Sequence, residues 1–367
     1  MKMKTKVYIQ YPWRVSDSQY YKSMIDNAPK NIEYIFENKP TGIITNRTKL
    51  ILFNSLKRSI RNPLEKTELP ILNIKKTVTD KEYDIIHNAH CLSKNNSPWV
   101  ADFESLWQMW VSGRDTSLGK RRVLEVLKKD SCKRIIAWTE YTKERIGNKF
   151  PEIKDKIVVV PYGMEKPEFK KIESKKIRLL FIARYFYEKG GMHTIEVMDR
   201  ITKLCDNVEA RIISEVPKKV IKEYSKNKKI KISGLLPHKE IMKDIYPNSD
   251  IMIYPGYSDT FGFALVESLA FGIPVITVDG HSRKDIIENN KTGFIIERSD
   301  ESNWYPKGEE VKRIIEELER KTMKLIKNKK LRNKMSEQAI KTVENGKFSI
   351  KKRNKILSGV YNEARNI

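Results

Sequence analysis

The sequence has 367 residues, too many for one ordinary hydrophobic core and enough for two domains of roughly 150–200 residues each. Its 39% hydrophobic and 32% charged residues are the balance of a soluble globular protein. The net charge of +25 is spread over both halves, which favours anionic ligands in general. This spread argues against nucleic acid as a partner, because a nucleic-acid footprint is usually a stripe or patch of cations.

Targeting and redox features point to the cytoplasm. Cys91, Cys132 and Cys205 lie far apart without a CxxC pair, so they indicate neither a disulfide framework nor a zinc site and suit a reducing compartment. Residues 6–11 have a strand pattern rather than the apolar segment of a secretory signal. No run approaches the ~18 apolar residues of a membrane-spanning helix, so we expect any membrane contact to be peripheral, at the inner face.

Strand and helix patterns alternate along the chain. In the first half, strands are predicted at 7–11, 32–36, 71–74, 84–86, 99–103, 135–138 and 157–161. Helical periodicity appears there at 118–129 and 141–150. In the second half, strands are predicted at 177–183, 210–214, 230–233, 250–254, 274–278 and 293–296. The helices between them are expected to begin near Gly191, Pro217, His238, Gly262 and Arg283.

This alternation is typical of parallel sheets that are covered by helices on both faces. We therefore expect an α/β protein of two Rossmann-like, doubly wound parallel-sheet domains. The polar stretch 164–176 is the expected boundary between them. Beyond Glu309 the pattern is almost continuously helical, with a break at Gly346.

The most informative segment is 254–274, where a strand, a loop and a helix follow one another. Gly262 opens the helix, Asp259 lies on the loop, and Glu267 lies about two turns into the helix. Ligands of open α/β sheets bind beside such helix N-termini, and ionised carboxylates accept hydrogen bonds from sugar hydroxyls. A loop aspartate and an ordinary helical glutamate are the alternative.

A second segment, 182–191, follows the first strand of the second half. Arg184 and Lys189 lie on its strand-to-helix loop, and two cations beside a helix N-terminus suit a diphosphate. In so lysine-rich a chain, a solvated basic loop that binds nothing is the alternative.

Together the two segments resemble a known family. The run 183–191 is similar to the diphosphate loop of the retaining group 1 (family 4) glycosyltransferases. Asp259 and Glu267 fall on the two acidic positions of that family's E-x7-E motif. The resemblance covers 155–345 well and the N-terminal half only loosely.

The resemblance implies the GT-B fold, in which two Rossmann-like domains face a cleft. Residues 1–165 would form the acceptor-side domain and residues 166–348 would bind the nucleotide sugar, while a last helix at 349–367 would pack back on the first domain. The implied activity is retaining transfer of a sugar from a nucleoside-diphosphate sugar to a glycan, lipid or other acceptor, in cell-envelope or glycan biosynthesis. No metal and no cofactor besides the donor substrate is implied.

The resemblance also implies roles for single residues. Glu267 would bind the ribose and Asp259 the donor sugar. Arg184 and Lys189 would neutralise the diphosphate that leaves. Asp259 stands where the family has glutamate, one methylene longer, which alters its reach to the sugar. The substrate-binding set at the start of the helix also contains Phe261, Gly262 and Phe263.

The N-terminal half departs further from the family. Its loop 12–19 lacks the glycine pair that many relatives place beside the diphosphate, and Arg14 or Ser16 would substitute. In relatives a histidine after the strand predicted at 84–86 contacts the donor sugar. His87 and His90 compete for this role, and we favour His90. A structural histidine at a strand end is the alternative.

Two further features suggest an acceptor and a membrane. Asp102 lies close to Trp99 and Trp107, and we predict an acceptor wall there because carbohydrates stack on aromatic faces and hydrogen-bond carboxylates. A buried strand tryptophan is the alternative. Residues 47–61 carry five cations and no acid, as in a surface helix on anionic lipid. A core-facing helix with a solvated basic side would have the same pattern.

The leading hypothesis is thus a metal-independent, retaining glycosyltransferase with a nucleotide sugar and a carbohydrate or lipid-linked acceptor as partners. In similar enzymes the donor phosphate itself deprotonates the acceptor, which explains why no separate catalytic base stands out. A nucleotide-sugar epimerase of the same architecture is an alternative, although it would need further carboxylates as acid and base. A non-catalytic basic protein that binds nucleic acid is another, and it predicts steeply salt-dependent binding.

Overall fold

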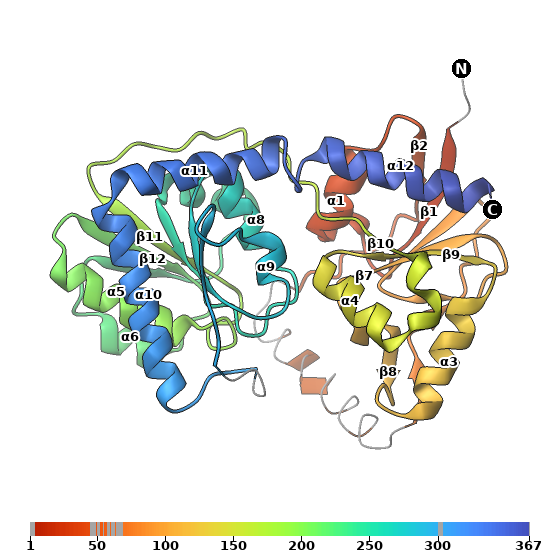
Figure 1. Cartoon of the computed structure of the whole chain (residues 1–367), viewed down its shortest axis with the longest axis horizontal. Helices are drawn as coiled ribbons and strands as arrows, with labels where there is room; N and C mark the ends of the chain where they lie inside the picture. The colour runs from red at the N-terminus through yellow and green to blue at the C-terminus, as the bar shows by residue number, and fades with distance from the viewer. Residues whose placement is uncertain are drawn as a thin grey trace. The chain divides into compact units, whose positions relative to one another are not determined.

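The computed structural model describes residues 4–44, 69–299 and 304–366, together with single positions between 49 and 63. The chain forms two compact units (Figure 1): unit 1 is Met1–Gly163 with Ile350–Ile367, and unit 2 is Met164–Ser349. The basic segment 47–61, considered above as a membrane-surface helix, lies outside the described residues apart from those single positions.

Unit 1 is built on a six-stranded parallel sheet with the order β10-β9-β7-β5-β1-β2. Its strands are β1 (Thr5–Gln10), β2 (Ile32–Ile35), β5 (Ile85–Ala89), β7 (Trp99–Phe103), β9 (Cys132–Ala137) and β10 (Ile157–Val159). Its helices include α1 (Gln19–Asp26), α3 (Ser117–Lys128) and α4 (Glu140–Lys149). Two small pairings are β3 (Ile71–Leu72) with β8 (Trp110–Ser112) and β4 (Ile74–Lys75) with β6 (Leu92–Ser93).

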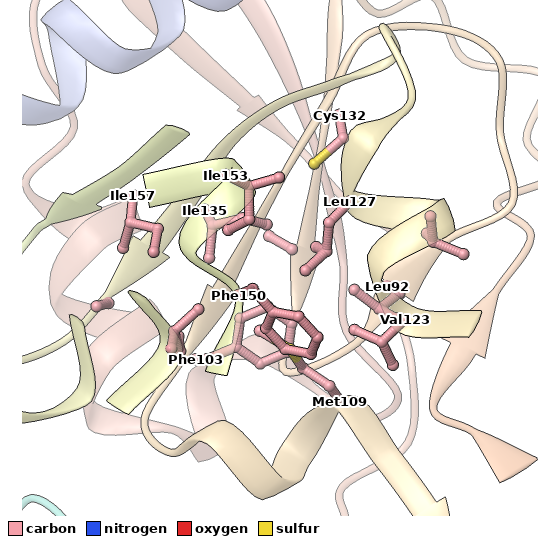
Figure 2. Close-up of a cluster of buried hydrophobic side chains, with 14 of the residues drawn as sticks. Leu92, Phe103, Met109, Val123, Leu127, Cys132, Ile135, Phe150, Ile153 and Ile157 are labelled. Atoms are coloured by element: carbon pink, nitrogen blue, oxygen red, sulfur yellow. The ribbon is translucent and has the colours of Figure 1, made fainter. Parts of the chain in front are cut away.

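The core of unit 1 forms where β7 and β9 meet the helices that cover them. Figure 2 shows Phe103, Leu127, Ile135 and Phe150 within one cluster of buried side chains, and all four are fully buried. All five residues of β7 are buried, as expected for a central strand of a sheet with both faces covered. This position also buries the one acidic residue of that strand, Asp102.

The last helix, α12 (Ile350–Asn366), belongs to unit 1 and lies against β1, β5 and β9 (Figure 1). Its Arg353 side chain is buried and donates hydrogen bonds to Ser23 Oγ (3.1 Å) and to the Asn27 carbonyl (3.0 Å). Tyr361, one of the fully buried residues of the same helix, reaches the sheet through its hydroxyl. The C-terminal helix is therefore held by polar contacts as well as by apolar packing.

Unit 2 contains a second six-stranded parallel sheet, with the order β13-β12-β11-β14-β15-β16. Its strands are β11 (Ile177–Ile182), β12 (Val208–Ile213), β13 (Ile230–Ser233), β14 (Ile251–Ile253), β15 (Val275–Val278) and β16 (Gly293–Ile296). Its helices are α5 (Gly191–Leu204), α6 (Lys218–Tyr224), α7 (His238–Glu240), α8 (Phe263–Ala270), α9 (Arg283–Ile286), α10 (Glu309–Lys327) and α11 (Lys329–Glu344). α5 and α10 pack on each other beside the sheet.

Both sheets have a point where the direction of chain order reverses. In unit 2, β11, β12 and β13 follow one another toward one side of the sheet, and β14, β15 and β16 follow one another toward the other side. The reversal therefore lies between the neighbours β11 and β14. In unit 1 it lies between β1 and β5. Open α/β sheets bind their ligands beyond the carboxyl ends of the strands at such a point. The topology therefore indicates one candidate site in each unit.

The predicted fold class is confirmed, whereas some local predictions are wrong. The single strand expected at 71–74 is split into β3 and β4, which pair with different partners. The α-helix expected at His238 has only three residues, and the backbone then continues as a π-helix at Ile241–Ile245. Helix α1 was not predicted. Within the described residues, no helix is both long and apolar enough to span a membrane.

Candidate active site

Two loops of unit 2 meet at the reversal point of its sheet. One loop, 183–190, follows β11, and the other, 254–262, follows β14. Because β11 and β14 are paired neighbours, their loops lie at the same edge, and the Gly256 amide donates to the Lys189 carbonyl oxygen (3.1 Å). The strand arrangement thus brings together two segments about seventy residues apart in the sequence.

A largely buried ion pair joins these loops. Lys189 Nζ lies 3.0 Å from Asp259 Oδ1, with side-chain exposures of only 14% and 15%. The same ammonium group donates to the carbonyl oxygen of Ser258 (3.2 Å). One cation and one carboxylate that the sequence singled out are therefore in direct contact, one from each loop.

Arg283 of α9 completes this charged cluster. Its side chain is fully buried and donates from Nη2 to the carbonyl oxygens of Gly256 (2.6 Å) and Asp259 (2.7 Å). The same nitrogen lies 3.9 Å from Asp259 Oδ2, and this oxygen accepts a hydrogen bond from the Tyr254 hydroxyl (2.5 Å). The guanidinium group thus fixes the backbone of the Asp259 loop and adds a second positive charge beside its carboxylate.

The cluster controls the ionisation of Asp259. Burial by itself would raise the pKa of this carboxyl group. The charges of Arg283 and Lys189 outweigh burial, so that the pKa is lowered. An ionised carboxylate accepts hydrogen bonds and donates none. Asp259 is therefore suited to a ligand that presents hydroxyl groups.

Helix α8 begins beside the cluster at Gly262. Its φ of 89° lies in the left-handed region, and a Cβ there would come within 3.1 Å of Asp259 Oδ2, so this position requires glycine. The N-terminus of α8 carries partial positive charge. The flanking Phe261 is fully buried and packs on Phe263 with ring centroids 5.0 Å apart. The structure therefore places Phe261 in the core rather than at an accessible surface.

Glu267 lies on α8 and is 94% buried, with 6% of its surface exposed. Its Oε1 is 2.8 Å from His238 Nε2, and its Oε2 accepts a hydrogen bond from the Tyr246 hydroxyl (2.8 Å). The imidazole of His238 is 44% exposed. Glu267 is thus fixed by two side chains, one of which is open to solvent.

Three predicted residues, Arg184 of unit 2 and Arg14 and Ser16 of unit 1, lie exposed on their own units. Arg184 follows β11 and makes no hydrogen bond or ion pair with the described part of the chain. Arg14 precedes the 3₁₀ turn Val15–Asp17, which contains Ser16 and follows β1 in unit 1. Arg184 lies on the same loop as Lys189. Arg14 and Ser16 follow β1, which borders the reversal point of the unit 1 sheet.

A hydrogen-bond network surrounds Asp102 in unit 1. The Tyr21 hydroxyl donates to both carboxylate oxygens (2.6 and 2.8 Å), and His87 Nε2 lies 3.0 Å from Oδ2. On its other side, His87 Nδ1 is 2.7 Å from the Tyr361 hydroxyl of α12. Burial alone would raise the pKa of Asp102, but the hydrogen bond with His87 and the nearness of His90 outweigh it and lower the pKa.

The two candidate histidines differ in accessibility. His87 is fully buried between its two partners, whereas the imidazole of His90 is 24% exposed. His90 directly follows β5 and has a φ of 55°, a conformation that is uncommon outside glycine. Its Nδ1 lies 3.5 Å from Asp102 Oδ1, and the centroids of its ring and of the Trp138 ring are 5.0 Å apart. Of the two, His90 is the histidine that a ligand can reach.

The surroundings of Asp102 do not form an open acceptor wall. Asp102 and Trp99 are both fully buried, and the Trp99 indole donates to Ser131 Oγ (3.1 Å). Trp107 is 42% exposed. The geometry links Asp102 to the two histidines rather than to solvent, and the alternative of a buried strand tryptophan fits Trp99.

Comparison with known proteins identifies unit 2. Residues 164–342, almost the whole unit, match the family described as "Glycosyl transferases group 1". This unit is a group 1 glycosyl transferase domain. The capsular polysaccharide biosynthesis glycosyltransferase CapM of Staphylococcus aureus is 27% identical over 236 residues, which are 59% of this chain and 57% of CapM. The chain matches only about three fifths of the length of such curated relatives.

Solved structures share the fold of both units. A glycosyltransferase from Rickettsia africae ESF-5 has a TM-score of 0.62 and 18% identity, with 99% of each chain covered. Anabaena Alr3699/HepE in complex with UDP also has a TM-score of 0.62, with 12% identity over 98% of this chain and all of that one. At these identities the likeness shows the fold, which is the GT-B fold of glycosyltransferases.

Sequence reasoning did not single out several residues that surround this candidate site. Arg283 and His238 stood out only as expected helix starts, while Tyr246 had no signal. Among the residues that the structure describes, no group of three or more His, Cys, Asp or Glu side chains is placed to hold a metal ion. Within the same residues the three cysteines are free, and two of them are buried.

Proposed function

We propose that this protein transfers a sugar from a nucleoside-diphosphate sugar to a carbohydrate or lipid-linked acceptor, with retention of configuration and without a metal ion. The observation that supports this most directly is the cluster of Lys189, Asp259 and Arg283 beyond the carboxyl ends of β11 and β14. Cations and a helix N-terminus neutralise a diphosphate, while a buried carboxylate accepts hydrogen bonds from sugar hydroxyls.

In this proposal Lys189 changes partner when the donor binds. Its ammonium group is paired with Asp259 at 3.0 Å. A diphosphate carries more negative charge than one carboxylate, so it attracts Lys189 and frees an oxygen of Asp259 for a hydroxyl of the donor sugar. Arg283 stays beside Asp259 and keeps it ionised. Arg184, exposed on the same loop, supplies a second cation to the diphosphate.

The remaining contacts divide between the two units. Glu267 is proposed to bind the ribose hydroxyls, with His238 and Tyr246 holding its carboxylate in place. In unit 1, His90 is the proposed contact to the donor sugar. Asp102, which is buried, acts on the substrate only by orienting His90.

The proposed reaction breaks the bond between the anomeric carbon and the diphosphate oxygen. The acceptor hydroxyl oxygen bonds to the same face of that carbon, and its proton passes to the departing phosphate. No protein side chain is then needed as the base. Lys189 stabilises the charge that develops on the leaving group, a contribution of ~3 kcal/mol to lowering the barrier.

Substrate classes follow from the relatives as further parts of the proposal. HepE was solved in complex with UDP and with UDP-glucose, so uridine nucleotides are the first donors to test. CapM is named for capsular polysaccharide biosynthesis, and a cell-envelope glycan is the acceptor class we propose. The reaction would take place at the cytoplasmic face of the membrane.

Nucleotide release from a panel of UDP-, GDP- and ADP-sugars, with and without EDTA, tests this function. Lys189→Ala is expected to lower kcat by about 10²–10³ fold, and Glu267→Gln is expected to raise KM for the donor. Lys120→Ala and Glu337→Gln, which change exposed residues, are the matched controls. The anomeric configuration of the product, measured by NMR, should equal that of the donor.

Different results would overturn different parts of the proposal. Activity that disappears with EDTA would contradict metal independence, and an inverted product would contradict retention. If no donor releases nucleotide and the protein instead binds DNA with a steep salt dependence that Glu267→Gln leaves unchanged, the nucleic-acid alternative is correct.

A further inference from the structure

A cavity of unit 2 lies apart from the candidate active site. It has a volume of about 280 Å³, and its polar lining consists of Arg178, Glu209, Arg211, Lys231 and Asn248. The four charged residues lie within the first four positions of β11, β12 and β13. The active-site loops instead follow the last residues of β11 and β14. Because these strands are parallel, the cavity and the active-site loops lie at opposite edges of the sheet.

The charges that line this cavity are unequally compensated. Arg178 Nε lies 2.9 Å from Asp250 Oδ2, and Lys176 Nζ lies 3.2 Å from Glu209 Oε2. Arg211 and Lys231, in contrast, make no side-chain hydrogen bond or ion pair with the part of the chain that the structure describes. Within the described residues, these two cations of the cavity lining therefore have no paired carboxylate.

These two cations also stand directly opposite each other. Arg211 and Lys231 are Cα partners in the pairing of β12 with β13. Arg211 is half-buried and Lys231 is exposed, and like charges at paired positions of neighbouring strands repel each other. An anion that bridges both groups would remove the repulsion and gain charge-assisted hydrogen bonds.

The size and the remaining polar groups narrow the class of anion. A volume of about 280 Å³ is just below the ~300–1,000 Å³ of sites for drug-sized ligands, which favours a small molecule. The Glu209 carboxylate would repel a bare anion but would accept a hydrogen bond from a hydroxyl group. Asn248 is held by Arg178 Nη1 (3.0 Å) through its Oδ1, which fixes one wall of the cavity.

We propose that this cavity binds a small phosphate monoester that carries hydroxyl groups, such as a sugar phosphate. Its phosphate would lie between Arg211 and Lys231, and a hydroxyl group would reach Glu209. The cavity would be a second binding site, separate from that of the nucleotide sugar. It does not depend on the proposed transferase activity.

Thermal unfolding of the full chain tests this site, with glucose 6-phosphate as the probe. Ionic strength is held constant, because a protein with a net charge of +25 responds to any anion. Glucose 6-phosphate at about 10 mM is expected to raise Tm by about 2 °C or more, because it binds only the folded protein. Glucose and inorganic phosphate should each give a smaller shift.

The substitution Lys231→Glu makes the test specific. It places a carboxylate opposite Arg211, so the free protein should be at least as stable as the wild type while the shift with glucose 6-phosphate disappears. Lys120→Glu, the same charge change on the exposed face of α3 in unit 1, should retain the shift. Lys189→Ala should retain it too.

Three outcomes would overturn the proposal. A shift lost in Lys189→Ala but kept in Lys231→Glu would place glucose 6-phosphate in the active site. An equal shift with inorganic phosphate would exclude a role for the hydroxyl groups. The absence of any shift would exclude a small phosphate monoester. If the protein without such a shift binds phosphatidylglycerol vesicles in a way that depends on Lys231, the cavity is assigned to a lipid headgroup.

Discussion

The two units share a sheet architecture but surround their central carboxylates in different ways. In unit 2, Asp259 faces Lys189 at 3.0 Å and Arg283 at 3.9 Å. In unit 1, Asp102 is bound by a tyrosine and a histidine within a buried network. A lysine ammonium group is able to exchange one anionic partner for another, whereas a directional hydrogen-bond network holds a side chain in one orientation. This contrast is why we propose a binding role for the cluster in unit 2 and a positioning role for the network in unit 1.

The largest effect is expected from breaking the unit 2 cluster at Arg283. In Arg283→Met two carbonyl oxygens lose their donor and Asp259 loses one of its cations. Since these groups are buried, unfolding should become easier by about 3 kcal/mol or more. Hydrogen exchange of backbone amides would measure this effect in each unit separately.

The matched control is Arg121→Met, because Arg121 is 71% exposed and its ion-pair partner is the exposed Glu125 on the same helix. This control should change stability by less than ~0.5 kcal/mol. The faster exchange in Arg283→Met should be confined to unit 2. A protein that exchanges like the wild type in unit 2 would show that Arg283 does not hold the Asp259 loop.

A smaller effect is expected from the network of unit 1. Tyr361→Phe removes the hydroxyl group that lies 2.7 Å from His87 Nδ1 and leaves a buried ring nitrogen without that partner. The expected loss of stability is about 1–3 kcal/mol, visible as faster amide exchange in β5 and α12.

Tyr83→Phe provides the comparison for this change, since the Tyr83 hydroxyl is only half-buried and 3.5 Å from Ser97 Oγ. Its effect should be under ~0.5 kcal/mol. If both phenylalanine variants exchange at the same rate in β5, the contact between α12 and His87 contributes nothing to the network.

The sequence predicted the architecture well because buried strands leave a clear pattern. All six residues of β11 are buried, and such a run between helical patterns has few other interpretations. Very short elements were the exception. β3 and β4 have two residues each, so their separation depends on their partners and not on their own sequence. Helix α7 was also hard to predict, because its three residues carry too little periodicity to show where the helix ends.

The candidate site was predictable only for those residues that lie on a loop directly after a strand. Lys189 and Asp259 lie on loops after strands, so their convergence follows once β11 and β14 are neighbours. Arg283 reaches the site from α9, and nothing in the sequence near it shows that its guanidinium turns back to Gly256. The burial of Asp102 was likewise hidden, because it results from the central place of β7 in the sheet.

The smallest effect should appear in the pH dependence of the unit 2 cluster. Because Lys189 and Arg283 lower the pKa of Asp259 below its unfolded value of about 3.9, its ionised form stabilises the folded protein. This contribution is fully present above the unfolded pKa and is lost as the pH falls through the folded pKa. The difference in unfolding free energy between the wild type and Asp259→Asn should therefore be constant from pH 7 to about pH 5 and shrink below about pH 4. Asp130→Asn, at an exposed turn, should show no such change. A difference for Asp259→Asn that is the same at pH 3 and pH 7 would mean that the two cations do not stabilise its ionised form, and the contrast between the two units would then be one of hydrogen bonds alone.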